Sequence, residues 1–126
     1  MKRFKVYLQH DSMECDMTCL RMTCKHYGAE YSSEYLSRLR FATTEGVSLL
    51  GMSEAAEHLG LHTMCGRLGL EQLRHMPLHC ILHWNQNLFV VLYRISKKFY
   101  IADPVKGLLT RSLEEMKEHW VSTRSW

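Results

Sequence analysis

Several features that would place this chain in a special class are missing from its 126 residues. The longest apolar run, Leu88 to Tyr93, has the length of a strand, whereas a membrane-spanning helix needs roughly 20 apolar residues. The N-terminus begins basic, but the apolar stretch and small-residue cleavage site of a secretory signal do not follow. We therefore expect a chain that is soluble as given and is not exported by that route.

A strong charge of one sign is also missing. The formal net charge is only +3, and the 16 basic residues are scattered rather than gathered into a stripe. This pattern argues against nucleic acid as the main ligand, and it remains compatible with a nearby membrane surface. Hydrophobic and charged fractions of 46% and 23% are ordinary for a folded protein. The length suits a single domain spanning residues 1–126.

Paired cysteine motifs are absent as well. Five cysteines form an odd set in a chain without an export signal, so we expect reduced thiols and a cytosolic compartment rather than a disulfide framework. Cys15, Cys19 and Cys24 lie near His26, but no CxxC pair and no second ligand cluster accompanies them. No P-loop motif occurs either. We therefore expect no metal, no cofactor and no ATP binding by these residues alone.

The first half of the chain has helical periodicity. An apolar stripe through Leu20 and Cys24 predicts a helix that begins near Cys15 or Asp16 and ends at Gly28. Two more helices are expected over residues 34–40, capped by a preceding serine, and over residues 48–58. A strand is expected over residues 61–66, and one or two helical turns over residues 70–75. We interpret the other cysteines and most methionines as core packing: Cys19, Cys24, Cys65, Cys80, Met13, Met17, Met22, Met52 and Met64.

The second half is rich in β-forming residues. Runs at residues 80–84, 88–95, 99–102 and 108–111 are separated by short turn sequences, and a last helical piece covers residues 113–120. Helices followed by an antiparallel sheet give an α+β fold, in which N-terminal helices pack on a C-terminal sheet.

One short stretch carries residues suited to thiol chemistry. Cys15 stands at the expected helix start, six residues after Gln9. A cysteine at a helix N-terminus can act as a nucleophile, and a nearby amide can donate to the oxyanion that its attack creates. Each residue alone has an ordinary alternative, because cysteine is commonly buried and Asp103-Pro104 is a common turn sequence.

The surrounding sequence resembles a known family. The stretch Gln9-His10-Asp11-Ser12-Met13-Glu14-Cys15-Asp16-Met17-Thr18-Cys19-Leu20 is similar to the papain-like peptidase domain at the N-terminus of bacteriocin-processing ABC exporters. Further landmarks of that family follow in the same order: Tyr27-Gly28, Gly46-Val47-Ser48, Ile81-Leu82-His83-Trp84-Asn85, Phe89-Val90-Val91-Leu92 and Ala102-Asp103-Pro104 with Gly107. The likeness covers about residues 8–107 and continues weakly to residue 120.

The resemblance implies a papain-like fold and a thiol peptidase that removes a leader peptide after a double-glycine site. It implies that Cys15 is the nucleophile, that Gln9 donates to the oxyanion and that Asp103 orients the catalytic histidine. It also implies three partners: the leader of an exported peptide, a transmembrane domain and a nucleotide-binding domain. The location would be the cytoplasmic face of the bacterial membrane.

Two positions depart from the family pattern. Leu88 stands where the family has the histidine that takes the thiol proton, and leucine can neither accept that proton nor protonate the leaving amine. Asp16 replaces the usual glycine after the nucleophile, and its charge opposes thiolate formation. We therefore expect weak or absent peptidase activity.

The remaining histidines offer little substitute. His83 belongs to the family's His-Trp landmark, and its offset of five residues predicts that it points away from position 88. The others are expected to be solvated on loops or helix surfaces: His10, His26, His58, His62, His75, His79 and His119. Three functions follow for testing: an impaired leader peptidase, a non-catalytic leader-binding domain of the same exporter type, and an interaction domain whose thiols sense redox state.

Overall fold

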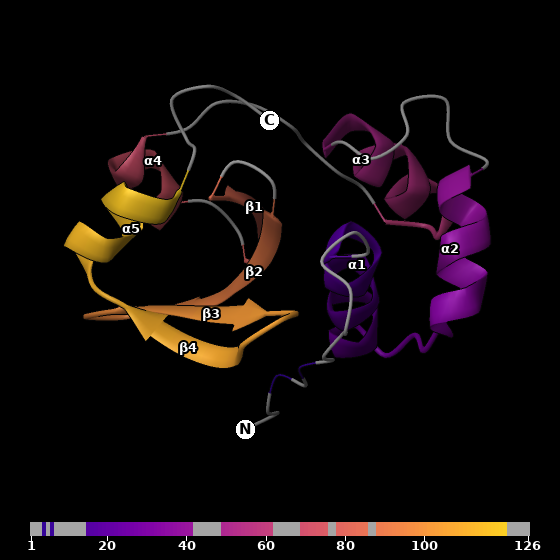
Figure 1. Ribbon diagram of the computed structural model, residues 1–126, viewed down its shortest axis with the longest axis horizontal. Helices are drawn as coiled ribbons and strands as arrows, with labels where there is room; N and C mark the ends of the chain where they lie inside the picture. Colours follow the sequence, from indigo (N-terminus) through magenta and orange to yellow (C-terminus); the bar gives the residue numbers. More distant parts are fainter. Residues whose placement is uncertain are drawn as a thin grey trace.

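The computed structural model describes residues 4, 6, 15–41, 49–61, 69–75, 78–85 and 88–120. These residues form two layers, with three helices on one side and a sheet with two shorter helices on the other (Figure 1). In chain order the elements are α1 (Cys15–His26), α2 (Ser33–Phe41), α3 (Leu49–His58), α4 (Leu70–Arg74), β1 (Cys80–Trp84), β2 (Leu88–Ile95), β3 (Phe99–Asp103), β4 (Gly107–Arg111) and α5 (Leu113–His119). None of the helices within these ranges has the length and apolar character needed to cross a bilayer.

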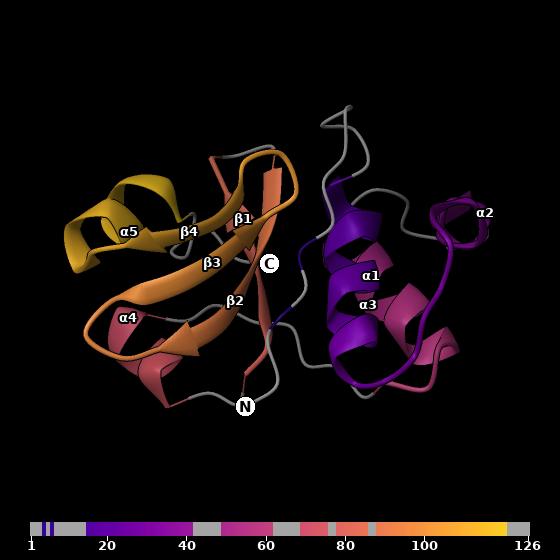
Figure 2. The same cartoon turned by 90° about the horizontal axis from the view of Figure 1, so that it is seen from below.

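The sheet is a simple meander. Its strand order is β1-β2-β3-β4, and each neighbouring pair is antiparallel. Short turns join the strands, so each pairs with its sequence neighbour. The predicted α+β architecture is confirmed: the helices α1 to α3 lie on one side of this sheet, with α1 next to it and α2 and α3 packed on α1 (Figure 2).

The ends of the first helices follow from local sequence. Gly28 and Gly60 have φ angles of 93° and 90°, a left-handed conformation that glycine adopts without a side-chain penalty. The amide nitrogens of Ala29 and Leu61 donate to the carbonyls of Cys24 and Ala56, at 2.9 and 3.0 Å. These bonds close the last turns of α1 and α3, so both predicted helix ends are confirmed.

Two hydrophobic cores lie on opposite faces of the sheet. The helix-side core comprises Phe4, Met17, Cys19, Leu20, Met22, Cys24, Leu36, Met52, Ala55, Ala56, Phe89, Val91 and Ala102. The sheet-side core comprises Leu73, Leu82, Trp84, Val90, Leu92, Phe99, Ile101, Met116 and Trp120. Strand β2 contributes alternate residues to each core because successive side chains of a strand point to opposite faces. This double burial explains why its sequence is almost continuously apolar.

The packing roles predicted for sulfur residues are confirmed at several positions. Met17, Met22, Met52, Cys19 and Cys24 are all buried in the helix-side core. Met13, Met64 and Cys65 lie outside the described residues, as do Gln9 and nearly all of the strand expected over residues 61–66.

The prediction of solvated histidines is wrong at three positions. His26 and His79 are half-buried with ring centroids 4.0 Å apart, and Phe4 stacks on His79 at 5.1 Å. His119 stacks on Trp84 at 5.3 Å. Helix-surface position does not decide exposure when an aromatic residue from a distant segment covers the ring, which is what happens at each of these sites.

Candidate active site

The candidate site is built around the first residue of α1. Helix α1 begins at Cys15, which confirms the predicted helix start, while the side chains of Cys15 and Asp16 lie outside the described part of the structure. The backbone position alone is informative, because the partial positive charge at a helix N-terminus favours a thiolate over a thiol.

Helix α1 is fixed to the start of β2 by a buried contact. The Cys19 thiol donates to the backbone carbonyl of Phe89, with the sulfur 3.2 Å from the oxygen. Residue 19 is one helical turn after residue 15, and residue 89 directly follows residue 88. The first turns of α1 therefore lie beside the strand position where the family pattern has its histidine.

Position 88 lies at the boundary between the two cores. Leu88 is half-buried and packs against both the helix-side core and the sheet-side core. It stands opposite Trp84 in the β1–β2 register. A side chain at this position can therefore reach the helical layer even though its strand neighbours Val90 and Leu92 belong to the sheet-side core.

Asp103 is the last residue of β3 and lies near position 88 at the start of β2. Ala102 stands opposite Val91, so continuing the antiparallel register places Asp103 opposite Val90. Residues 88, 90 and 103 then share one sheet face, with 88 and 103 as diagonal neighbours. Figure 2 shows the starts of α1 and β2 and the β3–β4 turn at one end of the molecule.

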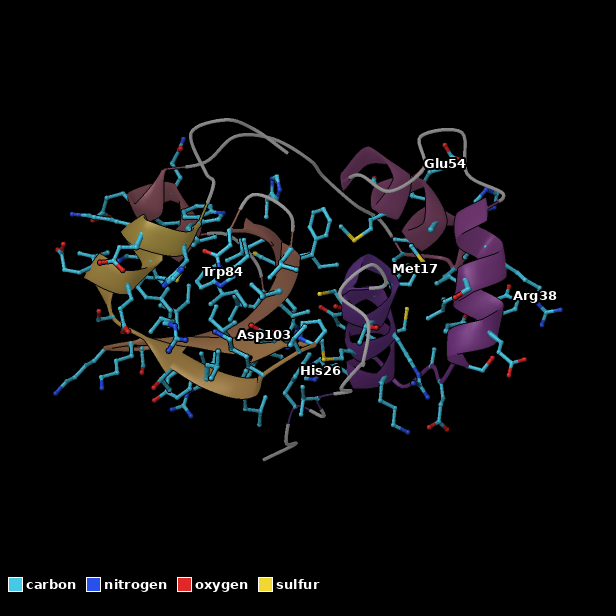
Figure 3. All side chains as sticks on the ribbon, in the orientation of Figure 1. Met17, His26, Arg38, Glu54, Trp84 and Asp103 are labelled. Carbon is cyan, nitrogen blue, oxygen red and sulfur yellow. The ribbon has the colours of Figure 1, made fainter. Side chains whose placement is uncertain are left out.

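The Asp103 carboxylate is buried, with 3% of the residue exposed. Its Oδ1 accepts hydrogen bonds from the backbone nitrogens of Val105 at 2.8 Å and Lys106 at 3.2 Å. These bonds fix the side chain in the β3–β4 turn (Figure 3). Because both use Oδ1, Oδ2 is the oxygen that could orient an imidazole at position 88.

His83 lies on the other face of the sheet. It stands opposite Phe89, and the two rings stack with centroids 5.3 Å apart and an angle of 22° between their planes. The predicted orientation away from position 88 is confirmed. Since Phe89 belongs to the helix-side core, His83 lies on the face toward α1.

Two other cysteines in the described residues are poor competitors for a nucleophilic role. Burial raises the pKa of Cys24 to about 11 and also raises the pKa of Cys80, because a low-dielectric surrounding disfavours the thiolate. Both thiols stay protonated near pH 7. In the described part of the chain, no three histidine, cysteine or acidic side chains gather into a possible metal site.

The sequence did not predict how the β1–β2 turn is held. The Asn85 backbone nitrogen donates to the His119 backbone carbonyl at 2.8 Å, and His119 Nδ1 lies 2.7 Å from the side-chain oxygen Oδ1 of Asn85. Trp120 also pairs with Trp84 through an isolated β-bridge. The end of α5 thus anchors the turn that precedes position 88, a contact between distant segments that local patterns do not encode.

Comparison with known proteins gives a consistent result. The model of the peptidase C39 family matches residues 3–123. The chain is 36% identical over 120 residues to the colicin V secretion/processing ATP-binding protein CvaB of Escherichia coli, covering 94% of this chain and 17% of CvaB. It is 30% identical over 123 residues to the lactococcin-G-processing and transport ATP-binding protein LagD of Lactococcus lactis subsp. lactis, covering 92% of this chain and 18% of LagD. The chain therefore spans less than a fifth of these relatives.

Solved structures show the same fold. A double glycine motif protease from an AMS/PCAT transporter, in complex with its leader peptide, superposes with a TM-score of 0.85 at 30% identity, covering 95% of this chain and 87% of the protease. The peptidase domain of Streptococcus ComA superposes with a TM-score of 0.80 at 27% identity, covering 95% and 94%. The papain-like α+β fold is thereby established for this chain.

Proposed function

Because this chain belongs to the peptidase C39 family, we propose that it is the leader-processing domain of a peptide-exporting ABC transporter and is catalytically impaired. Its ligand would be a leader peptide that ends in two glycines. The observation that carries the proposal is the convergence of the α1 start, the β2 start and the buried Asp103 at one end of the fold. A double glycine motif protease of the same fold has been solved with its leader peptide.

The proposed chemistry assigns one role to each group. The Cys15 sulfur would attack the carbonyl carbon of the second glycine, and the Gln9 amide would donate to the resulting oxyanion, together with backbone N–H groups at the α1 start. Collapse of the tetrahedral intermediate breaks the carbon–nitrogen bond and leaves a thioester for water to hydrolyse, and it requires that a base pass the thiol proton to the leaving amine. Asp103 would orient the imidazole that delivers it, but Leu88 provides no such group.

The second candidate is a domain that binds the leader without cutting it. One observation favours it: Leu88 packs against both cores, so the position of the missing base contributes to packing. A chain that retained the fold but lost the base would still present a binding surface. The two candidates share their ligand and differ only in whether a peptide bond breaks.

The wider context is also a proposal. The relatives are several times longer than this chain and are named as ATP-binding secretion or transport proteins. We infer that residues 1–126 form one N-terminal domain of such an exporter, on the cytoplasmic face of a bacterial membrane. The transmembrane and nucleotide-binding domains would be its permanent partners, and the leader its transient one.

The decisive experiment restores the base. We expect Leu88→His to raise cleavage of a Gly-Gly leader peptide by about 10² or more, the usual range for general acid–base catalysis. Cleavage is followed by mass spectrometry, and folding by circular dichroism. Cys15→Ala in the Leu88→His background should abolish the gain. Equal cleavage by the Leu88 and Leu88→His chains, with both folded, would show that the base position is wrong.

A second substitution tests the proposed role of Asp103. Asp103→Asn keeps Oδ1 as an acceptor for Val105 and Lys106, so the β3–β4 turn should survive while the charge is lost. In the Leu88→His background we expect kcat to fall by about 10² to 10⁴, as in other triads that lose the orienting carboxylate. Leader binding measured by calorimetry should be unchanged. If neither chain binds the leader, the leader-processing function itself is wrong.

A further inference from the structure

Cys19 makes a contact that its packing role does not require. The residue is fully buried, and its thiol donates to the Phe89 carbonyl at 3.2 Å across 70 positions of sequence. A small apolar residue would fill the same space. The hydrogen bond adds a directional constraint between α1 and β2.

Phe89 is also held through its ring. The ring stacks on His83 from β1 at 5.3 Å, and only 6% of the residue is exposed. On the other side of position 88, the β1–β2 turn is anchored at Asn85 by the end of α5. Asn85 and Phe89, on either side of position 88 in the sequence, are therefore each held by another element.

We propose that Cys19 is a positioning residue that sets the separation between residue 15 and residue 88, an inference that rests on the proposed function. Residue 19 is one turn from the nucleophile position, and Phe89 is adjacent to the base position. One thiol–carbonyl bond thus connects the helix that carries the proposed nucleophile to the strand that carries the proposed base position. Misplacement of reacting groups by about 1 Å can lower a rate by 10², so a short tether at this point has a direct effect on turnover.

The chain offers a matched control for this role. Cys24 lies on the same helix, belongs to the same core and is 2% exposed. The structure gives its thiol no hydrogen bond within the described residues, and burial raises its pKa to about 11. Cys19→Ala and Cys24→Ala remove the same atoms from the same layer, but only the first removes a tether between α1 and β2.

The catalytic test is made in the Leu88→His background. We expect Cys19→Ala to lower kcat by about tenfold or more with KM unchanged, and Cys24→Ala to leave kcat within about twofold, at similar losses of thermal stability. Cys19→Ser retains a donor and should keep kcat within about threefold of the Cys19 parent. Equal kcat values for the two alanine variants, or a serine variant no better than alanine, would overturn the proposal. If Cys19→Ala does not fold, Cys19→Val replaces it as the variant of similar volume without a donor.

A second measurement does not depend on catalysis. In the chain with Leu88, amide hydrogen exchange at the start of β2 should be faster in Cys19→Ala than in Cys24→Ala, while exchange in β3 stays the same in both. If Leu88→His shows no gain in cleavage, the proposed base position is wrong, and the exchange experiment still decides whether Cys19 holds β2. Identical exchange at residues 89 and 90 in the two variants would refute the tether.

Discussion

The two faces of the sheet are packed with different kinds of side chain. The helix-side core is rich in sulfur, with Met17, Cys19, Met22, Cys24 and Met52. The sheet-side core relies on aromatic and branched residues, including Trp84, Phe99, Ile101 and Trp120. Methionine is flexible and adapts to irregular gaps, whereas aromatic rings fill space in a few fixed orientations. The helical layer is therefore the more adaptable of the two.

The candidate site lies where these two kinds of packing meet. The proposed nucleophile position is on α1 in the adaptable helical layer, whereas Asp103 is fixed by two backbone hydrogen bonds in the β3–β4 turn. Leu88 touches both cores. This difference gives the Cys19–Phe89 bond its importance, because an adaptable helix needs a directional contact to hold it against a rigid sheet.

The largest effect on stability should come from removing a large side chain from the sheet-side core. Phe99 is 1% exposed, and the Arg74 guanidinium lies 5.1 Å above its ring. We expect Phe99→Ala to lower the free energy of unfolding by about 4 to 5 kcal/mol, and Met22→Ala by only about 2 kcal/mol, because flexible neighbours can partly fill the smaller cavity. Urea unfolding measures both. A Met22→Ala loss equal to that of Phe99→Ala would remove the contrast between the cores.

A smaller effect on stability is expected at His79, which lies between the helices and the sheet. His79 is packed among Phe4, His26 and Tyr27, and Tyr93 from β2 stacks on Phe4. Burial, together with the nearby charge of His26 when protonated, lowers the pKa of His79 to about 4. The unfolded chain therefore binds this proton below about pH 6.5, whereas the folded chain does so only near pH 4.

Folding stability therefore falls as the pH is lowered. Between those two pH values the unfolded state holds more protons, so stability is full above pH 6.5 and falls as the pH is lowered toward 4. Because His79 is only half-buried, we expect a loss of about 1 to 2 kcal/mol from this group. His79→Phe should flatten that part of the urea midpoint profile, whereas His58→Gln, at an exposed position on α3, should not. Parallel profiles for the His79→Phe and parent chains would contradict this account.

Most of the fold could be predicted because its signals are local. The glycines that end α1 and α3, the serine before α2 and the short turns between strands act over a few residues, and all lie where the sequence placed them. The wrong predictions share one cause. The contact of His26 with His79 and the stacking of His119 on Trp84 join segments that are distant in sequence, and neither spacing nor composition records such contacts.

The candidate site likewise has features that the sequence predicts and contacts that only the structure shows. The motif order identified Asp103, and the structure adds its burial and its turn hydrogen bonds. The sequence shows a leucine at position 88, where the family pattern has a histidine, but it does not predict the contact of Leu88 with both cores. The sequence predicts only a packing role for Cys19, because the partner of its thiol is a backbone carbonyl 70 residues away. The roles of Gln9, Cys15 and Asp103 stay predictions, and the side chains of Gln9 and Cys15 lie outside the described part of the structure.

The smallest predicted effect compares one helix start from each layer. At α5 the Ser112 hydroxyl accepts from the Glu115 amide at 3.2 Å, and the Glu115 carboxylate accepts from the Ser112 amide at 2.9 Å. At α2 the Ser32 hydroxyl accepts from the Tyr35 amide at 3.1 Å, and the acidic residue of that first turn is Glu34 rather than a return partner at position 35.

Removing either hydroxyl leaves an amide at a helix start without its acceptor, and loss of such a cap lowers stability by about 1 kcal/mol. We expect Ser112→Ala to lower the free energy of unfolding by about 1 kcal/mol and Ser32→Ala by about half as much, because only the Ser112 hydroxyl belongs to a reciprocal pair that also orients the acidic side chain. Urea unfolding at pH 7 compares them. A larger loss for Ser32→Ala would contradict this expectation. It would mean that the first turn of α2 matters more for packing on the helix-side core than the first turn of α5 does for packing on the sheet-side core.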